Sequence, residues 1–137
     1  MKQKLDYIML VDDDKIGNFF HERVIRKYKT TISVIIKESA EEALYYLQNK
    51  ECNENTLPVI IFLDINMPGM NGWEFLEEYK NLDKKLHCKV ILVILTTSQN
   101  TEDIFKAKSN DIIFALKTKP LDKEILDEIF QKYCLEI

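Results

Sequence analysis

Short apolar runs alternate with amphipathic stretches along the whole chain. Two runs, at 59–63 (VIIFL) and 90–95 (VILVIL), are apolar at every position, which predicts strands buried on both faces of a sheet. The run at 32–36 mixes polar and apolar positions and predicts a partly covered strand at a sheet edge. Runs at 7–11 (YIMLV) and 112–116 (IIFAL) complete a pattern of five predicted strands.

The segments between these runs carry apolar residues at helical spacing, which predicts five helices. The first covers 15–28, and the second follows a capping-box match at 39–42. The third begins near Asn71, after the turn sequence MPGMNG, and a short fourth helix covers 102–108. The last covers 121–133. Apolar residues of the first helix fall at Ile16, Phe19, Phe20, Val24 and Ile25.

Strict alternation of strands and helices favours a parallel sheet, because parallel neighbours must be joined by crossovers, which are right-handed. We therefore predict an α/β fold: a five-stranded parallel sheet with strand order 2-1-3-4-5 and helices on both faces. This is a doubly wound, flavodoxin-like arrangement. One domain is expected over 1–137, with its core at about 5–134 and no output domain.

Composition narrows the class of protein. Of the 137 residues, 46% are hydrophobic and 31% charged, and the net charge of −4 argues against a nucleic-acid binder. No run reaches the roughly 18 apolar residues of a membrane span, and the N-terminus lacks a signal peptide, so we expect a cytoplasmic protein. Cys52, Cys88 and Cys134 are far apart and odd in number, which favours reduced thiols. His21 and His87 have no ligand spacing and are expected at the surface or in helices.

Acidic residues follow two of the predicted strands, at the edge where ligands bind in open α/β sheets. Asp12 and Asp13 follow the first strand and Asp64 follows the third, its neighbour in the expected order. Carboxylates that share a pocket repel one another, and at least one resists ionisation unless a cation is present. Magnesium suits such a pocket, because it prefers oxygen ligands and needs only one or two carboxylates. Asp14 is expected to cap or begin the first helix.

Four motifs in order give the chain a family resemblance. They are Asp12-Asp13 after YIMLV, Asp64 in IIFLDINMPGMNGWEFL, Thr96 in VILVILTTS and Lys119-Pro120 in LKTKPL. The intervals are 51 residues from Asp13 to Asp64, 32 from Asp64 to Thr96 and 23 from Thr96 to Lys119. Each motif alone is common. Together, each at a predicted strand end, they resemble the receiver domains of two-component signalling, including the single-domain receivers of chemotaxis.

The resemblance implies a phospho-accepting switch rather than a conventional enzyme. Asp64 matches the phospho-acceptor, a carboxylate that forms an aspartyl-phosphate. Asp13 matches the direct ligand of Mg²⁺ (or Mn²⁺), with Asp12 supporting it through water, and with Asp64 and the backbone carbonyl of Asn66 as further ligands. The implied donor is a sensor histidine kinase or a histidine phosphotransfer protein.

The resemblance also implies how the phosphoryl group is held. Thr96, the amide of Thr97 and the Lys119 ammonium match the groups that contact its oxygens, and this positioning and charge supply most of the catalysis. A cis Lys119-Pro120 bond is expected. Water attacks the same phosphoryl group, so the signal decays.

The chain departs from the family pattern on the fifth strand. In the family, phosphorylation draws the threonine hydroxyl inward and repacks an aromatic residue, but here the matching position is Leu116. Phe114 is expected to share the face of Leu116, because strand side chains alternate. The side chains of Asn66 and Ser98 are hypothesised to tune the decay. The fourth helix, fifth strand and fifth helix are the expected output face for an unknown downstream protein; its lysines are Lys106, Lys108, Lys117, Lys119 and Lys123.

Two other functions compete with the switch. A haloacid-dehalogenase-type phosphatase also uses an aspartate after an apolar strand, but it needs a second aspartate where this chain has Asn66, and a cap domain. The alternative is a receiver-like interaction module that is not phosphorylated. Structural roles also stay open: Asp12 to Asp14 as a loop and helix cap, Thr96 as an ordinary strand-end residue, and Lys119-Pro120 as a helix start.

Overall fold

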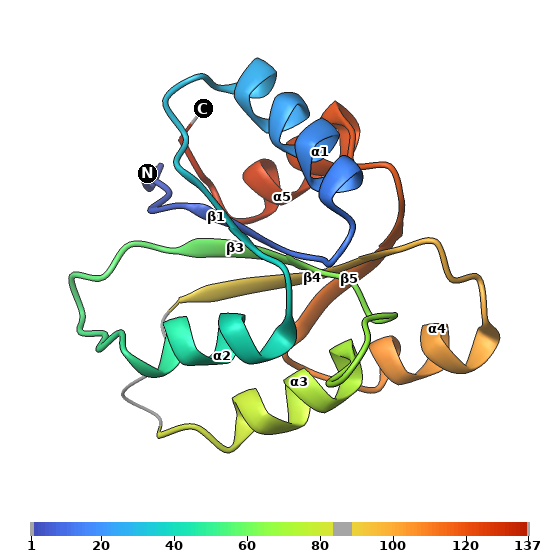
Figure 1. The fold of residues 1–137 in the computed structure, drawn as a ribbon. Coiled ribbons are helices and arrows are strands. Elements are labelled where there is room, and N and C mark those ends of the chain that lie inside the picture. The colour runs from blue at the N-terminus through green and yellow to red at the C-terminus, as the bar shows by residue number, and fades with distance from the viewer. Residues whose placement is uncertain (1, 84–88, 137) are drawn as a thin grey trace.

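The computed structural model describes residues 2–83 and 89–136. Its strands form one parallel sheet in the order β2-β1-β3-β4-β5, with α1 and α5 on one face and α2, α3 and α4 on the other (Figure 1). The predicted fold class is therefore confirmed. The strands are β1 Ile8–Val11, β2 Val34–Lys37, β3 Val59–Leu63, β4 Val90–Thr96 and β5 Ile113–Thr118. The helices are α1 Lys15–Tyr28, α2 Ala40–Gln48, α3 Gly72–Lys80, α4 Thr101–Lys108 and α5 Lys123–Lys132.

The central strand β3 is buried at every position, as its continuous apolar run predicts. Ile61 and Leu63 belong to the core beneath α2, α3 and α4, whereas Ile60 and Phe62 belong to the core beneath α1 and α5. Strand β2 lies at the sheet edge and all its residues are half-buried, which confirms the expected edge strand. The sheet thus separates two apolar cores and carries polar residues only at its strand ends.

Helix starts follow the predicted caps with one difference. Asn71 and Glu74 form a complete capping box at the start of α3. At α2, Ser39 Oγ accepts a hydrogen bond from the Glu42 amide, but the Glu42 carboxylate accepts from the amide of Glu38, one residue before the position that the motif predicts. In both helices the side chain of the cap residue satisfies a free amide of the first helical turn, and the glutamate satisfies an amide just before the helix.

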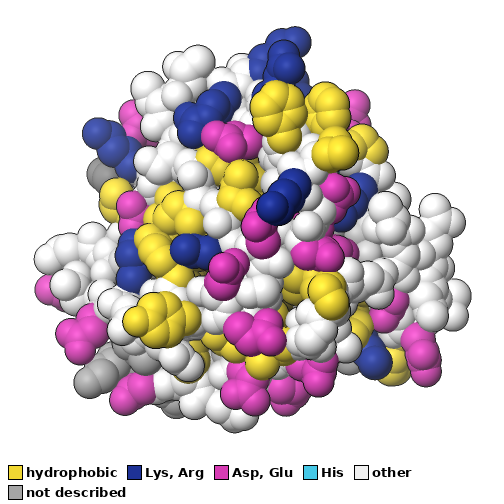
Figure 2. Space-filling view, in the orientation of Figure 1, with side chains coloured by type: hydrophobic (Ala, Val, Ile, Leu, Met, Phe, Trp, Pro, Cys, Tyr) yellow, Lys and Arg dark blue, Asp and Glu magenta, His cyan; other side chains and the backbone are white. Residues whose placement is uncertain are grey.

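The apolar spacing of α1 does not identify its buried face. Ile16, Phe19 and Phe20 are 72%, 57% and 56% exposed, and apolar side chains gather on the surface over this helix (Figure 2). The buried side of α1 instead holds Asn18, His21 and Ile25. His21 lies in a helix, which is one of the two placements expected for it, but its side chain is only 5% exposed; His87 lies outside the described residues. The inner face is polar because the start of α1 packs beside the acidic strand ends.

The expected shared face of Phe114 and Leu116 is also wrong. Strand β5 has a register shift, in which Leu92 pairs with Ile113 and Val93 pairs with Ala115. The extra residue inverts the alternation of side chains. Phe114 packs on the α5 side, with its ring 5.3 Å from that of Tyr133, while Leu116 packs against the core on the opposite face.

The cysteines differ in part from expectation. Cys52 takes part in a disulfide bond, whereas Cys134 is free and exposed, and Cys88 lies outside the described residues. The expectation of reduced thiols is thus wrong for Cys52. Within the described ranges, no helix combines the length and apolar character that crossing a bilayer requires.

Candidate functional site

Asp12 and Asp64 meet because their strands are neighbours in register. Val11 pairs with Leu63 across β1 and β3, so the next residue of each strand emerges at the same edge of the sheet. The Asp64 amide donates a hydrogen bond to the Val11 carbonyl at 3.0 Å, and the Asp12 amide donates to the Lys37 carbonyl at 3.1 Å. Sheet pairing therefore fixes the backbones of both aspartates, which are 5% and 7% exposed.

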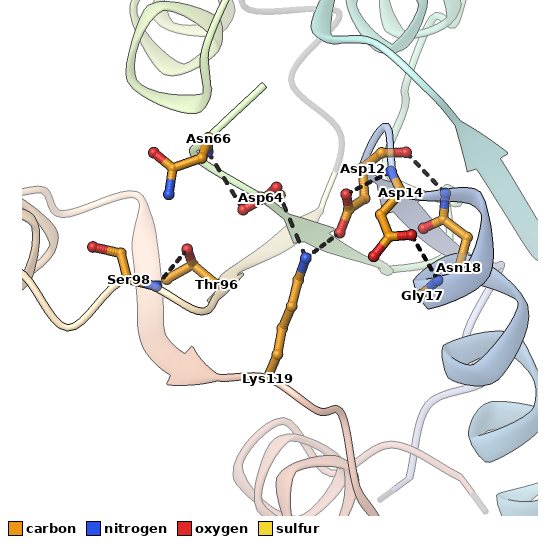
Figure 3. A network of polar contacts seen from close by, with 9 residues as sticks. All are labelled: Asp12, Asp14, Gly17, Asn18, Asp64, Asn66, Thr96, Ser98 and Lys119. Carbon is orange, nitrogen blue, oxygen red and sulfur yellow. Dashed lines mark hydrogen bonds and ion pairs between the residues drawn. The ribbon is translucent and has the colours of Figure 1, made fainter. Parts of the chain in front are cut away.

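A tight turn follows Asp12 and leads into α1. Asp12 Oδ1 accepts a hydrogen bond from the Asp14 amide at 3.0 Å, and Asp14 caps the helix by accepting from the Gly17 amide. The Asn18 side chain donates to the Asp12 carbonyl at 2.8 Å in a buried contact. Asp12 is thus held at its amide, carbonyl and carboxylate, and the expected capping role of Asp14 is confirmed (Figure 3).

Lys119 reaches the two buried aspartates from the end of β5 (Figure 3). Its Nζ lies 2.6 Å from Asp12 Oδ2 and 3.8 Å from Asp64 Oδ2, and its side chain is 16% exposed. The Lys119 amide donates to the Thr96 carbonyl at 2.9 Å, which ties it to the end of β4. The Lys119-Pro120 bond is cis, as expected.

Glycine allows the loop after Asp64 to pass close to α3. A Cβ on Gly72 would lie 2.7 Å from Ile65 Cα and 2.8 Å from the Asp64 carbonyl oxygen, both backbone atoms that cannot yield easily. Gly69 has a φ of +72°, a left-handed conformation that favours glycine. The glycines of the turn motif MPGMNG thus allow the start of α3 to pack against the backbone of Asp64 and Ile65.

The electrostatics of the pocket reflect burial and like charge. Burial raises the pKa of the Asp64 carboxyl, and the Asp12 carboxylate raises it further, against the opposing effects of Lys119 and nearby backbone amides. Burial alone would lower the pKa of Lys119, but its hydrogen bond to Asp12 and the nearby acidic groups outweigh burial and raise it. The pocket therefore holds more negative charge than one ammonium balances.

Oxygen ligands for a metal are close together in this pocket. Asp12, Asp13 and Asp64 each offer one carboxylate oxygen, and these oxygens lie within 4.8 Å of one another. Asp13 is exposed, so the cluster opens toward solvent on that side. A compact set of hard oxygens with access for water fits Mg²⁺ or Mn²⁺. Asn66 is exposed in the same loop, and its amide donates to Asp64 Oδ1 at 3.4 Å.

The threonines predicted for the site lie at the end of β4. Thr96 is fully buried, and its Oγ1 accepts a hydrogen bond from the Ser98 amide at 3.1 Å. Thr97 is exposed beside it. In Figure 3, Asp64 lies between Thr96 and Asn66 on one side and Asp12 on the other. The four predicted strand ends therefore contribute to one neighbourhood.

Sequence reasoning missed the polar residues that support this pocket. Asn18 and His21 share the buried side of α1 with Ile25. Their spacing is helical, but a buried helix face is recognised in sequence by apolar residues, and these two are polar. Burial lowers the pKa of His21, and the Lys119 charge lowers it further, against Asp12 and Asp14. No signal in the sequence indicated that Asn18 and His21 are buried beside the pocket.

A model of the response regulator receiver domain family matches residues 8–131 of this chain. The response regulator Rcp1 of Synechocystis sp. is 34% identical over 99 residues. That alignment covers 71% of this chain and 65% of Rcp1, so the chain spans slightly less than two thirds of the relative's length.

Solved structures show the same fold. A two-component response regulator from Cytophaga hutchinsonii superposes with a TM-score of 0.82 at 31% identity, covering 97% of this chain and 98% of that one. The phosphorylated cyanobacterial phytochrome response regulator RcpA superposes with a TM-score of 0.70 at 27% identity, covering 97% and 94%. With the family match over most of its length, the chain belongs to the response regulator receiver domain family of two-component signalling.

Proposed function

We propose that Asp64 accepts a phosphoryl group in a magnesium-dependent reaction and that the resulting aspartyl-phosphate switches protein–protein interactions. The observation that carries this proposal is that Asp64 shares one pocket with the Lys119 ammonium, 3.8 Å from its Oδ2, and with carboxylate oxygens of Asp12 and Asp13 within 4.8 Å. The donor is a phosphohistidine on a sensor histidine kinase or a histidine phosphotransfer protein. An Asp64 carboxylate oxygen forms the new bond to phosphorus as the histidine nitrogen–phosphorus bond breaks.

The side chains around Asp64 have distinct roles in this proposal. Lys119, Thr96 and the Thr97 amide contact the phosphoryl oxygens and stabilise the charge that spreads over them during transfer. Lys119 is already 3.8 Å from Asp64, so a small movement away from Asp12 brings it to the transferred group. Sheet pairing fixes the Asp64 backbone, which orients the attacking oxygen without further ordering.

Asp12, Asp13, Asp64 and the backbone carbonyl of Asn66 would hold Mg²⁺ or Mn²⁺ in this proposal. The ion would supply positive charge that neutralises the carboxylates and polarises the phosphoryl group. Asp13, as the exposed member of the cluster, is the ligand nearest to arriving solvent and donor. Burial of Asp12 and Asp64 strengthens their attraction to a cation, because the pocket is shielded from bulk water.

The relatives support phosphorylation as the chemical event. RcpA is a phosphorylated response regulator of the same fold, and its alignment covers 97% of this chain. We extend that state to Asp64, which follows the buried strand β3. Water attack on the aspartyl-phosphate returns the resting state, and we propose that the Asn66 and Ser98 side chains tune that rate by controlling access. The output face is formed by α4, β5 and α5.

The phosphatase alternative is weaker, because Asn66 occupies the position where a second aspartate is required. The interaction-module alternative is tested by incubation with acetyl phosphate and Mg²⁺, followed by intact-mass measurement. We expect a gain of one phosphoryl group that is lost in Asp64→Asn and kept in Asp111→Asn, a control at an exposed aspartate. Failure of the wild-type protein to gain mass with acetyl phosphate or a phosphohistidine donor would favour the interaction module.

A further inference from the structure

A chain of hydrogen bonds leads from Thr96 to the surface between α3 and α4. The Ser98 amide donates to Thr96 Oγ1 at 3.1 Å, and the Ser98 hydroxyl donates to Asp103 Oδ2 at 2.8 Å. The other Asp103 oxygen accepts from Trp73 Nε1 at 3.0 Å. Four residues from β4, the following loop, α4 and α3 are therefore joined in series.

Asp103 is the junction of this chain. Each of its carboxylate oxygens accepts one neutral donor, and hydrogen bonds to an ionised acceptor are stronger than those between neutral groups. The Trp73 ring is also held from its face, because the Lys106 ammonium lies 5.5 Å from the ring centroid. Residues of α4 therefore hold the Trp73 indole both at the edge of the ring and over its face.

Ser98 connects Thr96 to the start of α4. Besides its two donated bonds, its Oγ accepts from the amide of Asn100, and Asn100 caps α4 by accepting from the Glu102 amide. A displacement of Ser98 therefore acts on the helix cap and on Asp103 together. The Ser98 amide thus bonds to β4, and the Ser98 hydroxyl bonds to α4.

We propose that Thr96, Ser98, Asp103 and Trp73 form a relay that transmits phosphorylation of Asp64 to the surface between α3 and α4. This inference rests on the proposed function. A phosphoryl oxygen is a charged acceptor for the Thr96 hydroxyl hydrogen. Turning the hydroxyl toward it moves Oγ1 away from the Ser98 amide, because threonine side chains change between discrete rotamers. Ser98 then shifts, and with it the Asp103 carboxylate and the Trp73 indole.

The relay takes a route that does not depend on an aromatic side chain in β5. Leu116 has no aromatic ring that could repack when Thr96 moves. Phe114 does have a ring, but it packs on the opposite face of the sheet. The relay ends at a groove of about 360 Å³ whose lining includes Trp73, Phe105 and Lys106. Phe105 is 72% exposed there, so movement of Trp73 changes a surface that solvent and partners can reach.

Fluorescence of Trp73, the single tryptophan in the chain, tests the relay directly. Emission is recorded in constant Mg²⁺ before and after acetyl phosphate, and intact mass gives the phosphorylated fraction of the same sample. We expect a change in the emission of the wild-type protein that grows with the phosphorylated fraction. In Asp103→Ala the change is expected to be lost at an equal phosphorylated fraction. Glu102→Ala removes a carboxylate from the same helical turn and should keep it.

Ser98→Ala separates transmission from a local effect on the tryptophan. It removes the bond from Ser98 to Asp103 but leaves the bond from Trp73 to Asp103, so the resting emission should be unchanged and the response to phosphorylation lost. A full response in either Ser98→Ala or Asp103→Ala would overturn the relay, as would a phosphorylated wild-type protein with unchanged emission. Absence of any mass gain would instead overturn the proposed function, and the relay with it.

Discussion

The Lys119 ammonium is closer to Asp12 than to Asp64, at 2.6 Å against 3.8 Å. The Lys119 ammonium therefore neutralises mainly the Asp12 carboxylate. It makes a weaker contact with the carboxylate of Asp64, the proposed phosphoryl acceptor. Because Asp12 is buried, its carboxylate depends on Lys119 wherever no other cation is bound. This relationship links the stability of the domain to the chemistry of its site.

Lys119→Met should destabilise the protein in the absence of divalent cations, because it leaves a buried carboxylate without its partner. We expect a loss of about 1–3 kcal/mol in the free energy of unfolding, measured by urea titration. Lys117→Met, which removes a more exposed partner of Glu128, should cost clearly less. Equal losses in the two variants would contradict a special role for the Lys119 contact.

Magnesium should stabilise the folded protein, because the cluster of Asp12, Asp13 and Asp64 exists only in the folded state. At one hundred times the dissociation constant, linkage gives about 2.7 kcal/mol of added stability. Thermal unfolding with and without Mg²⁺ measures this, and Asp13→Asn should remove most of the shift. Asp111→Asn serves as the control, and a Mg²⁺ effect of the same size in both variants would place the ion elsewhere.

Asn18→Ala should reveal the support that α1 gives to Asp12. It leaves the Asp12 carbonyl without its buried donor, which we expect to cost about 1–3 kcal/mol. Asn49→Ala is the matched control, because the Asn49 amide also donates to a backbone carbonyl, that of Tyr45, but in an exposed contact. The two changes are compared by urea unfolding, and a smaller loss at Asn18 than at Asn49 would refute the prediction.

Tyr28 should make stability fall at alkaline pH. Burial and a hydrogen bond to Asp127 raise the pKa of Tyr28 to about 12. A group with a raised pKa in the folded state contributes its full stability below its ordinary pKa of 10.0 and loses it as the pH rises toward 12. Unfolding free energies at several pH values between these limits should therefore fall less steeply in Tyr28→Phe. The exposed Tyr45→Phe should keep the wild-type slope.

The sheet could be predicted because its evidence is local. A continuous apolar run such as 59–63 fits a strand covered on both sides, and five predicted strands separated by helices leave few topologies. The site followed from the same logic, since Asp12, Asp64, Thr96 and Lys119 each end or follow a strand. The ends of buried strands can thus be predicted from sequence when a polar residue follows the apolar run.

The errors arose where tertiary structure overrides local pattern. The inner face of α1 is set by what it covers, so Asn18 and His21 are buried while more apolar neighbours are exposed. The face of Phe114 depends on its pairing with β4, which its own sequence does not record. The bond between Trp73 and Asp103 joins segments 30 residues apart, and neither residue carries a signal of the other.

The register shift in β5 divides that strand into two parts whose orientations are set independently. Beyond the shift, Ala115 pairs with Val93 and Thr118 with Thr96, and this pairing carries Lys119 into the pocket. Deleting Phe114 would leave this later pairing intact and remove only the ring that contacts Tyr133. We therefore expect chain length before Ala115 to tolerate evolutionary change, whereas a single inserted residue between Ala115 and Lys119 would turn the lysine out of the pocket.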